Sequence, residues 1–252
     1  TGTMSEVFGA EHFQHDYRQR LWQHAEISQA RYGELDARVR AIIEAYHAGL
    51  KQYMQEHPEQ VPEWAPALEP WMCVALGRFI IWGWPEGDAG GDMKRGGIEP
   101  DPIGYRGSNQ WLVAAERTAA KAPIALIDPH LSWYGPFRFY EARLYGENIG
   151  YSGMAIPGLP LPSLGHSQFI SVAMTTGGPD AADCYAEELH PDDPRKYKYD
   201  DEWRDMTVRT DVIKVKDGEE IVVQQVEFEH THHGPVAARK DGKATVLKIP
   251  YA

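Results

Sequence analysis

Ser108 is the side chain in this sequence whose surroundings best suit covalent chemistry. It follows Gly107 at the point where a Gly-, Asp- and Pro-rich segment gives way to residues typical of strands. A serine hydroxyl is a weak nucleophile at neutral pH and reacts only when a base is positioned beside it. A lone Gly-Ser pair is most often a turn, so the surrounding residues must decide between the two interpretations.

Three histidines near the C-terminal end are a second group with chemical potential. His230, His232 and His233 are of a type that binds zinc, which takes nitrogen and sulfur donors. Neighbouring residues of a strand point to opposite faces, so only His230 and His232 would share one face. The sequence offers no third ligand beside them, and a zinc site is therefore disfavoured. A metal-dependent hydrolase would lose activity with a chelator and tolerate Ser108→Ala.

The elements that must position Ser108 begin with a helical part. Apolar residues recur at helical spacing over residues 35–53, with charged residues outside that face. A proline-rich connector over 57–70 is expected to lead to a second, buried helix over 71–84. Residues 85–107 are rich in Gly, Asp and Pro and are expected to form an exposed loop.

After Ser108 the sequence favours strands. β-Branched or alternating apolar residues lie between turn residues at 111–114, 124–127, 169–174, 207–215, 221–227 and 245–249. The pairs Asp217-Gly218 and Asp241-Gly242 are typical of hairpin turns. The sequence therefore predicts an α+β fold with a helical part over 1–84, a spacer over 85–107 and a β-rich part over 108–252.

Composition excludes several classes of protein. The chain has 252 residues and a formal net charge of -12, which argues against binding to nucleic acid. Apolar residues make up 42% of it, enough for a sizeable core. No stretch is long and apolar enough for a membrane span, and the first residues lack a signal-peptide pattern. Cys73 and Cys184 are expected to be free, buried thiols, with one disulfide as the alternative in an oxidising compartment.

A series of short motifs brings these observations together. They are Gly107-Ser108-Asn109-Gln110-Trp111, Ile127-Asp128-Pro129-His130-Leu131, Pro157-Gly158-Leu159-Pro160, Leu164-Gly165-His166, Thr175-Thr176-Gly177 and His233-Gly234-Pro235-Val236. Their order and spacing resemble the start of the catalytic subunit in the penicillin acylase and acyl-homoserine lactone acylase family. Upstream, the segment 44–50 (EAYHAGL) resembles a helix of the family's smaller subunit, so the resemblance covers nearly the whole chain.

The resemblance implies an amide hydrolase of the N-terminal-nucleophile class with a four-layer αββα sandwich. The chain would be cut between Gly107 and Ser108, and the freed α-amino group of Ser108, with an ordinary pKa of about 8, would take the hydroxyl proton. One donor to the tetrahedral intermediate would be the backbone N–H of Thr176. The family's second donor falls beyond Ala252, so the remainder of the same precursor is expected as the partner of this chain.

The resemblance also assigns supporting roles. His130 would position the nucleophile and the incoming amide, and Asn109 would orient the amine; the alternatives are a backbone hydrogen bond and a capping role. Leu131, Leu164 and Met174 align with positions that line the family's acyl pocket, although each is equally an ordinary core residue. Their aliphatic side chains suit a fatty acyl chain better than a phenyl ring.

An acidic segment matches positions that hold calcium in several family members. Asp180, the carbonyl of Ala182 and Asp183 would supply three oxygens, and Asp92 or Asp88 a further carboxylate. The ion would be structural, no organic cofactor is implied, and the alternative is that these aspartates cap turns.

The substrates that the resemblance implies are small N-acyl amines. They include penicillin-like β-lactams and acyl-homoserine lactones, with roles in antibiotic biosynthesis or quorum quenching. A periplasmic or secreted location follows from the same resemblance. The alternative function is that of a non-processed, non-catalytic binding protein of the same fold.

Overall fold

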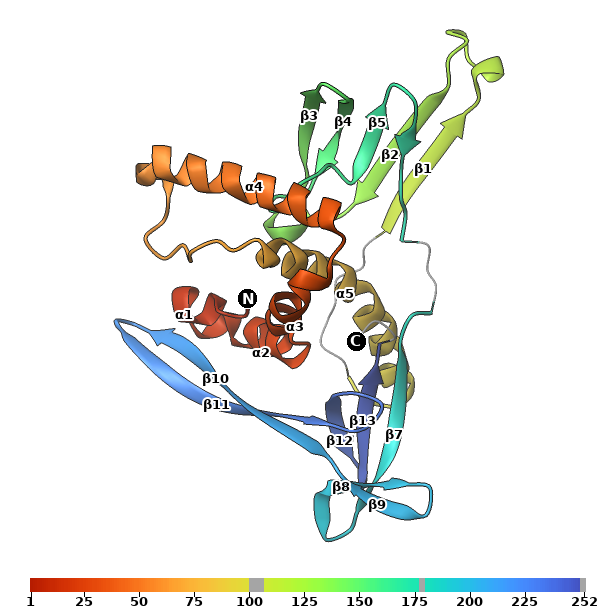
Figure 1. Ribbon diagram of the computed structural model, residues 1–252. Helices are drawn as coiled ribbons and strands as arrows, with labels where there is room; N and C mark the ends of the chain where they lie inside the picture. Colours follow the sequence, from red (N-terminus) through yellow and green to blue (C-terminus); the bar gives the residue numbers. More distant parts are fainter. Residues whose placement is uncertain (100–106, 177–179, 250–252) are drawn as a thin grey trace.

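The computed structural model describes residues 1–99, 107–176 and 180–249 of the chain. A helical N-terminal part is followed by a β-rich C-terminal part, which confirms the predicted α+β fold (Figure 1). The helices are α1 (Met4–Phe8), α2 (Phe13–Leu21), α3 (His24–Arg31), α4 (Ala37–Glu56) and α5 (Trp71–Arg95). Short 3-10 turns lie at Ala10–His12, Tyr32–Glu34, Pro58–Gln60, Ala115–Arg117 and Gly135–Phe137.

The strands form antiparallel sheets. Two ribbons consist of β1 (Gly107–Val113) with β2 (Ile124–His130), and β10 (Thr207–Asp217) with β11 (Glu220–His230). A four-stranded sheet has the order β3 (Tyr140–Gly146), β4 (Ile149–Ala155), β5 (Leu164–Ser167) and β6 (Ser171–Val172). A five-stranded sheet has the order β12 (Val236–Lys240), β13 (Lys243–Lys248), β7 (Asp183–His190), β8 (Asp193–Tyr199) and β9 (Glu202–Asp205).

Helix α4 is the helix that the apolar spacing over residues 35–53 predicts. Its first turn is capped by Asp36, whose carboxylate accepts a hydrogen bond from the Arg38 N–H at 2.9 Å. Much of its apolar face is uncovered, since Val39 is 45% and Ile42 is 42% exposed. Spacing therefore predicted the helix, whereas the exposure of that face did not follow from the sequence.

Helix α5 continues to Arg95, so the exposed loop expected from residue 85 does not begin there. Pro85 lies inside the helix and is buried, and Ala89 belongs to the main core. The Cys184 thiol of β7 donates a hydrogen bond to the Ala89 carbonyl at 3.3 Å. Packing against β7 therefore outweighs the low helix propensity of the glycine-rich sequence. Residues 100–106, also assigned to that loop, lie outside the described residues.

Both hairpins predicted from Asp-Gly pairs are present. Asp217 closes the β10–β11 ribbon opposite Glu220, and Gly218 has a φ of 63°. Asp241 and Gly242, which join β12 to β13, have φ angles of 50° and 73°. Positive φ at both central residues is the requirement of a type I′ turn, which Asp241-Gly242 meets, whereas a positive φ at the first central residue alone, Gly218, is typical of a type II′ turn.

Other strand predictions are confirmed only in part. β1, β2, β10, β11 and β13 form where the sequence indicates, but the segment 169–174 contributes only the two residues of β6. Phe169 before it is 84% exposed, so the apolar run there is not a buried strand. The sequence did not indicate β3, β4, β5, β7, β8, β9 or β12, because charged and small residues replace the β-branched pattern in strands such as DPRKYKY and IGYSGMA.

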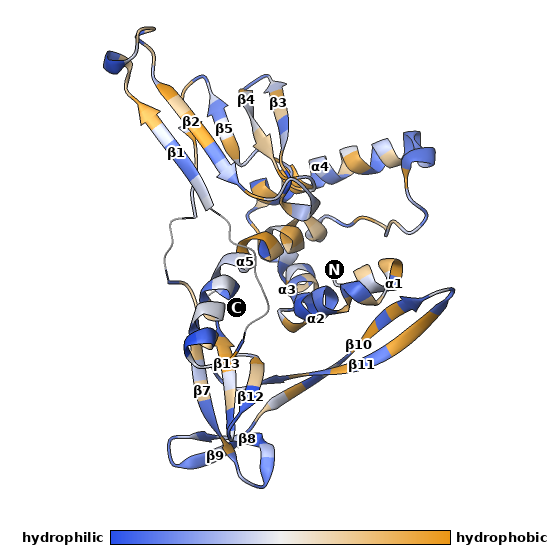
Figure 2. Ribbon diagram, turned by 180° about the vertical axis from the view of Figure 1, so that it is seen from behind, coloured by the Kyte–Doolittle hydropathy of each residue, from blue (hydrophilic) through white to orange (hydrophobic). Residues whose placement is uncertain are grey.

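The main core joins the helical and β-rich parts. Its buried members are Leu21, Trp22, Trp82, Ala89, Ala182, Phe228, Leu247 and Ile249. Hydrophobic stretches also run along β1, β2, β10 and β11 (Figure 2). Cys73 and Cys184 are free, as predicted, and are half-buried rather than buried. Within the described residues no helix has the length and apolarity of a membrane span.

We expect Phe228→Ala to lower the free energy of unfolding by about 3–5 kcal/mol, because a large cavity would open in the main core. The Phe228 ring is 1% exposed and packs against the Tyr17 ring at 4.8 Å between centroids. Urea denaturation measures the change. Phe169→Ala is the matched control, since an exposed ring should alter stability by less than about 0.5 kcal/mol. Equal losses in the two variants would contradict this account of the core.

Candidate functional site

The first two motifs after the glycine-rich segment lie side by side in the β1–β2 ribbon. The antiparallel register places Gly107 opposite His130, Ser108 opposite Pro129 and Asn109 opposite Asp128. The two motifs, about twenty residues apart in sequence, are thus paired with each other at one end of the β1–β2 ribbon. Ser108 is at the second position of β1 and is half-buried.

A chain of polar contacts runs across this section. The Ser108 hydroxyl donates a hydrogen bond to the Gly107 carbonyl oxygen at 2.6 Å. The Nε2 atom of His130 lies 3.3 Å from the Asn109 amide nitrogen and 2.9 Å from a carboxylate oxygen of Asp128. One ring nitrogen cannot donate to Asp128 and accept from Asn109 at once. The shorter contact favours the tautomer with a proton on Nε2, which donates to Asp128.

Asp128 is a candidate site residue that the sequence did not single out. The hydrogen bond from His130 is the largest cause that holds the pKa of Asp128 below its ordinary value. Both side chains are about half exposed, at 52% for His130 and 50% for Asp128. Only the pairing register of β1 and β2 places Asp128 beside Asn109, and the sequence does not reveal that register.

Thr176 lies at the end of a described segment, beyond β6. Thr176 is half-buried, and Gly177 after it lies outside the described residues. The backbone N–H role of Thr176 therefore stays a prediction. Upstream, the Ser167 hydroxyl accepts hydrogen bonds from the N–H groups of Phe169 and Ile170 at 3.0 and 3.2 Å.

The three residues assigned to an acyl pocket lie in different surroundings. Leu131 is half-buried and packs against a cluster that contains Ile80 and Phe137. Leu164 in β5 is 4% exposed, and Met174 is 53% exposed. Because Met174 is exposed to solvent while Leu164 is buried, the three side chains do not line one common pocket in the described residues.

A cavity of about 900 Å³ lies beside the segment that follows β2. The sequence did not indicate it. Its lining includes His24, Phe79, Trp82, Ser132, Tyr134 and Phe137. Burial, reinforced by the charge of Arg78, lowers the pKa of His24 to about 3, so this ring is neutral at physiological pH. Most of its lining comes from the N-terminal helices and α5, and Ser132, Tyr134, Pro136 and Phe137 line it from the segment after β2.

The acidic residues proposed for calcium come from α5 and the start of β7. Burial, followed by the charges of Asp92 and Asp183, raises the pKa of Cys184 to about 11, which places both carboxylates near that thiol. Asp92 is also paired with Arg95, and Asp180 is exposed while Ala182 is buried. The oxygen donors suit calcium. Among the described residues, however, these carboxylates do not lie close enough together to form a group of metal ligands. The calcium site therefore stays a prediction.

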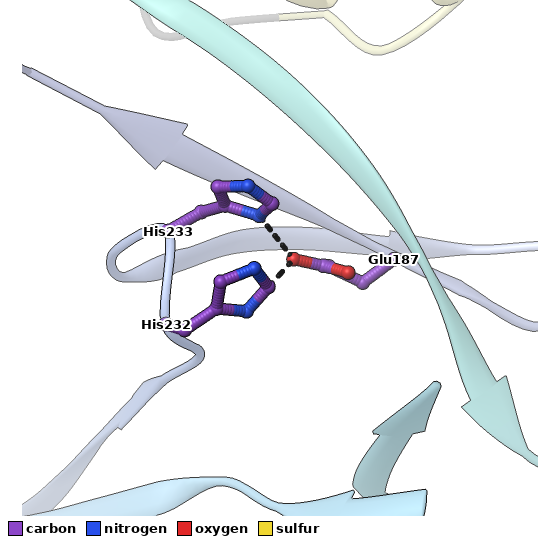
Figure 3. A group of neighbouring side chains, drawn as sticks. All are labelled: Glu187, His232 and His233. Carbon is purple, nitrogen blue, oxygen red and sulfur yellow. Dashed lines mark hydrogen bonds and ion pairs between the residues drawn. The ribbon is translucent and has the colours of Figure 1, made fainter. Parts of the chain in front are cut away.

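The histidine pattern differs from the strand-based interpretation. His232 and His233 lie in a turn between β11 and β12, not on a strand, and both approach Glu187 of β7 (Figure 3). The His233 Nδ1 atom is 2.6 Å from a Glu187 carboxylate oxygen, and the His232 Nδ1 atom is 3.9 Å from it. The expectation that His230 and His232 share one face is therefore wrong, because the alternation of a strand does not apply in the turn.

A helical part packs on antiparallel sheets, and Ser108 lies near the start of strand β1. Comparison with known families agrees with this α+β arrangement. The chain belongs to the penicillin amidase family, whose profile matches residues 1–252.

Several curated proteins are similar to the chain. The acyl-homoserine lactone acylase PvdQ of Pseudomonas fluorescens is 27% identical over 232 residues, which are 79% of this chain and 29% of that protein. The penicillin acylase 2 proenzyme of a Pseudomonas species is 31% identical over 61% of this chain and 20% of that protein. The aculeacin-A acylase of Actinoplanes utahensis is 29% identical over 52% and 16%. The chain thus spans less than a third of the length of these relatives.

A solved structure supports the fold. The thermostable penicillin G acylase from Alcaligenes faecalis aligns with a TM-score of 0.51 and 24% sequence identity. The alignment covers 56% of this chain and 26% of the acylase. At this identity the likeness concerns the arrangement of the elements and not their chemistry.

We expect His130→Ala to raise the pKa of Asp128 toward its ordinary value of about 3.9, because the hydrogen bond that favours the carboxylate would be lost. The stabilisation from this bond is present above the ordinary pKa and is lost as pH falls through the lowered one. Carbon-13 NMR titration of the aspartate side chains measures it. His166→Ala is the control, and an unchanged Asp128 titration in His130→Ala would refute the contact.

Calcium is expected to raise the melting temperature, since an ion that binds only the folded state stabilises it by about 2.7 kcal/mol at 100 times its dissociation constant. Scanning calorimetry with CaCl₂ and with EGTA measures the difference. Asp183→Asn should abolish the difference, whereas Asp192→Asn, in a turn between β7 and β8, should retain it. Identical melting of the unaltered protein in CaCl₂ and in EGTA would rule the calcium site out.

Proposed function

We propose that this protein is an N-acyl amide hydrolase whose nucleophile is Ser108, exposed when the Gly107–Ser108 peptide bond is cut. The observation that carries the proposal is the Ser108 hydroxyl, which lies 2.6 Å from the carbonyl oxygen of the peptide unit to be cleaved. Membership of the penicillin amidase family over residues 1–252 supports it. For the whole protein we infer a four-layer αββα sandwich.

Processing would start from this short contact. The Ser108 oxygen attacks the Gly107 carbonyl carbon as its proton is lost, the carbon–nitrogen bond breaks, and the nitrogen takes up a proton. The resulting ester is hydrolysed by water, which leaves a carboxylate on Gly107 and a free amine and hydroxyl on Ser108. The hydrogen bond already holds the hydroxyl on the side of the carbonyl, which favours an intramolecular reaction.

Acyl transfer would then use the new amine as base. It takes the hydroxyl proton as the Ser108 oxygen attacks the substrate's acyl carbon, and it returns that proton to the departing amine. Water hydrolyses the acyl ester and releases the acid. The Thr176 N–H would donate to the developing oxyanion. His130, oriented by Asp128 and adjacent to Asn109, would position the incoming amide.

The substrate class follows from the relatives and the residues beside the site. The similar proteins are named as acylases of acyl-homoserine lactones, penicillin and aculeacin A. Leu131 packs among apolar side chains directly after His130, and aliphatic surfaces suit a fatty acyl chain. We therefore favour N-acyl amines with an aliphatic acyl group, acyl-homoserine lactones among them.

A non-catalytic binding protein of the same fold is the second candidate. It would fold with the Gly107–Ser108 bond intact and bind acyl amides without turnover. It predicts no difference in chain length between the unaltered protein and Ser108→Ala, so the same measurement separates the two functions.

We expect the protein, expressed at its natural length, to yield a fragment that begins Ser-Asn-Gln-Trp, while Ser108→Ala remains uncut because it has no hydroxyl nucleophile. Intact-mass analysis with N-terminal sequencing detects the cut. Ser132→Ala is the matched serine control and should be processed normally. A folded, uncut and inactive natural-length protein would exclude the N-terminal-nucleophile mechanism and support the binding protein.

A further inference from the structure

A cluster of Glu187, His232 and His233 lies on the five-stranded sheet, which does not contain Ser108 (Figures 1 and 3). Each side chain offers one ligand atom, and these atoms all lie within 4.8 Å of one another. We propose that Glu187, His232 and His233 bind a divalent transition-metal ion of the zinc type, which joins the turn after β11 to strand β7.

The backbone of the turn explains why adjacent histidines reach one carboxylate. Thr231 donates its N–H to the Gly234 carbonyl at 2.9 Å, and its hydroxyl accepts the His233 N–H at 3.2 Å. The His232 N–H donates to the Tyr197 hydroxyl at 3.2 Å. Gly234 has a φ of 152°, and a Cβ there would lie 2.1 Å from the Leu247 carbonyl oxygen. The turn is therefore fixed by contacts that require these residue types.

Aromatic side chains orient both imidazoles. The His233 ring stacks on the Tyr185 ring with centroids 3.6 Å apart and 10° between the planes. The His232 ring lies nearly parallel to Tyr197 and meets the edge of Tyr199 at 4.7 Å. Rings held in this way lose little further freedom on binding an ion, which is the usual benefit of a preorganised site.

The donor set selects the metal. Two imidazoles and one carboxylate form a set that binds zinc with a fourth position open to water, whereas calcium and magnesium prefer oxygen ligands alone. With bonds of about 2.0–2.2 Å, ligand atoms in a tetrahedral site lie about 3.3 Å apart. The contacts of Glu187 with His233 at 2.6 Å and with His232 at 3.9 Å lie on either side of that spacing. Small rotations of the two rings would therefore suffice.

Burial and access also suit an ion. The Glu187 side chain is 9% exposed, whereas those of His233 and His232 are 21% and 32% exposed, so solvent reaches the open side of the cluster. To bind an ion through Nδ1, His233 must be in the tautomer that carries its proton on Nε2. Arg204 and Lys248 are positive groups near His232 and oppose a cation, which favours metals with strong affinity for nitrogen.

The test is zinc binding to the natural-length protein after treatment with a chelator. Isothermal titration with ZnCl₂ should show one ion per chain, and Co²⁺ should give the intense absorption of a four-coordinate site. His232→Asn and Glu187→Gln should each weaken zinc binding at least about tenfold, the loss seen even when an outer partner of a metal ligand is removed. His190→Asn, on the same sheet but outside the cluster, is the matched control.

Each outcome decides the proposal. Saturable binding that both cluster variants weaken and His190→Asn preserves supports the site. Absence of saturable binding, equal affinity in His232→Asn, or a six-coordinate Co²⁺ spectrum overturns it. Circular dichroism verifies the fold of each variant. Of the two histidine contacts with Glu187, His232→Asn removes the longer one, at 3.9 Å, and leaves the Glu187–His233 bond, so it gives an answer even if Glu187→Gln does not fold.

Discussion

The register between β1 and β2 is the constraint on which the candidate site depends. Side chains alternate along a strand, so a slip of one residue would turn Ser108 to the other face and separate Asn109 from Asp128. Thr118, in the loop between these strands, holds that register. Its buried hydroxyl donates to the Ala122 carbonyl at 2.7 Å and accepts the Ala122 N–H at 3.2 Å. These two hydrogen bonds fix the conformation of the loop and so the position at which β2 begins to pair with β1.

A second constraint connects the helices to the β10–β11 ribbon. Arg20 of α2 pairs with Asp211 of β10 at 3.0 Å, and Arg209 donates to the Arg20 carbonyl oxygen. The Arg209 guanidinium also lies over the Phe228 ring at 4.4 Å. Because these groups are partly buried, their contacts are screened less by salt than those of surface pairs. They fix where the main core meets the N-terminal helices.

The fold could be predicted from sequence where local signals decided the structure. Asp36 and the apolar spacing after it sufficed for α4, and the Asp-Gly pairs sufficed for two hairpins. Strands β4 and β5 were missed because a long-range contact decides them. A Cβ on Gly153 would lie 2.1 Å from the Leu164 carbonyl oxygen, so the two strands approach through glycine. The continuation of α5 past Pro85 likewise depends on packing that only the tertiary structure reveals.

The same distinction applies to the chemical groups. Motif order located Ser108, Asn109 and His130, whereas the proximity of Asp128 needed the strand register. The pairing of His232 with Glu187 needed a turn that alternation along a strand could not foresee.

Burial differs between the two polar clusters in a way that suits different roles. On β1, Trp111 is 68% and Leu112 is 77% exposed, so little apolar burial stabilises the ribbon that carries Ser108. In contrast, Ala244 and Val246 of β13, next to the strand that carries Glu187, are fully buried. Segments with few buried contacts open at low free energy, whereas core strands open only with global unfolding. The proposed cut at Gly107–Ser108 would therefore fall on the exposed ribbon, where a peptide bond can distort, whereas the proposed metal ligands lie on the buried sheet, where their spacing is kept.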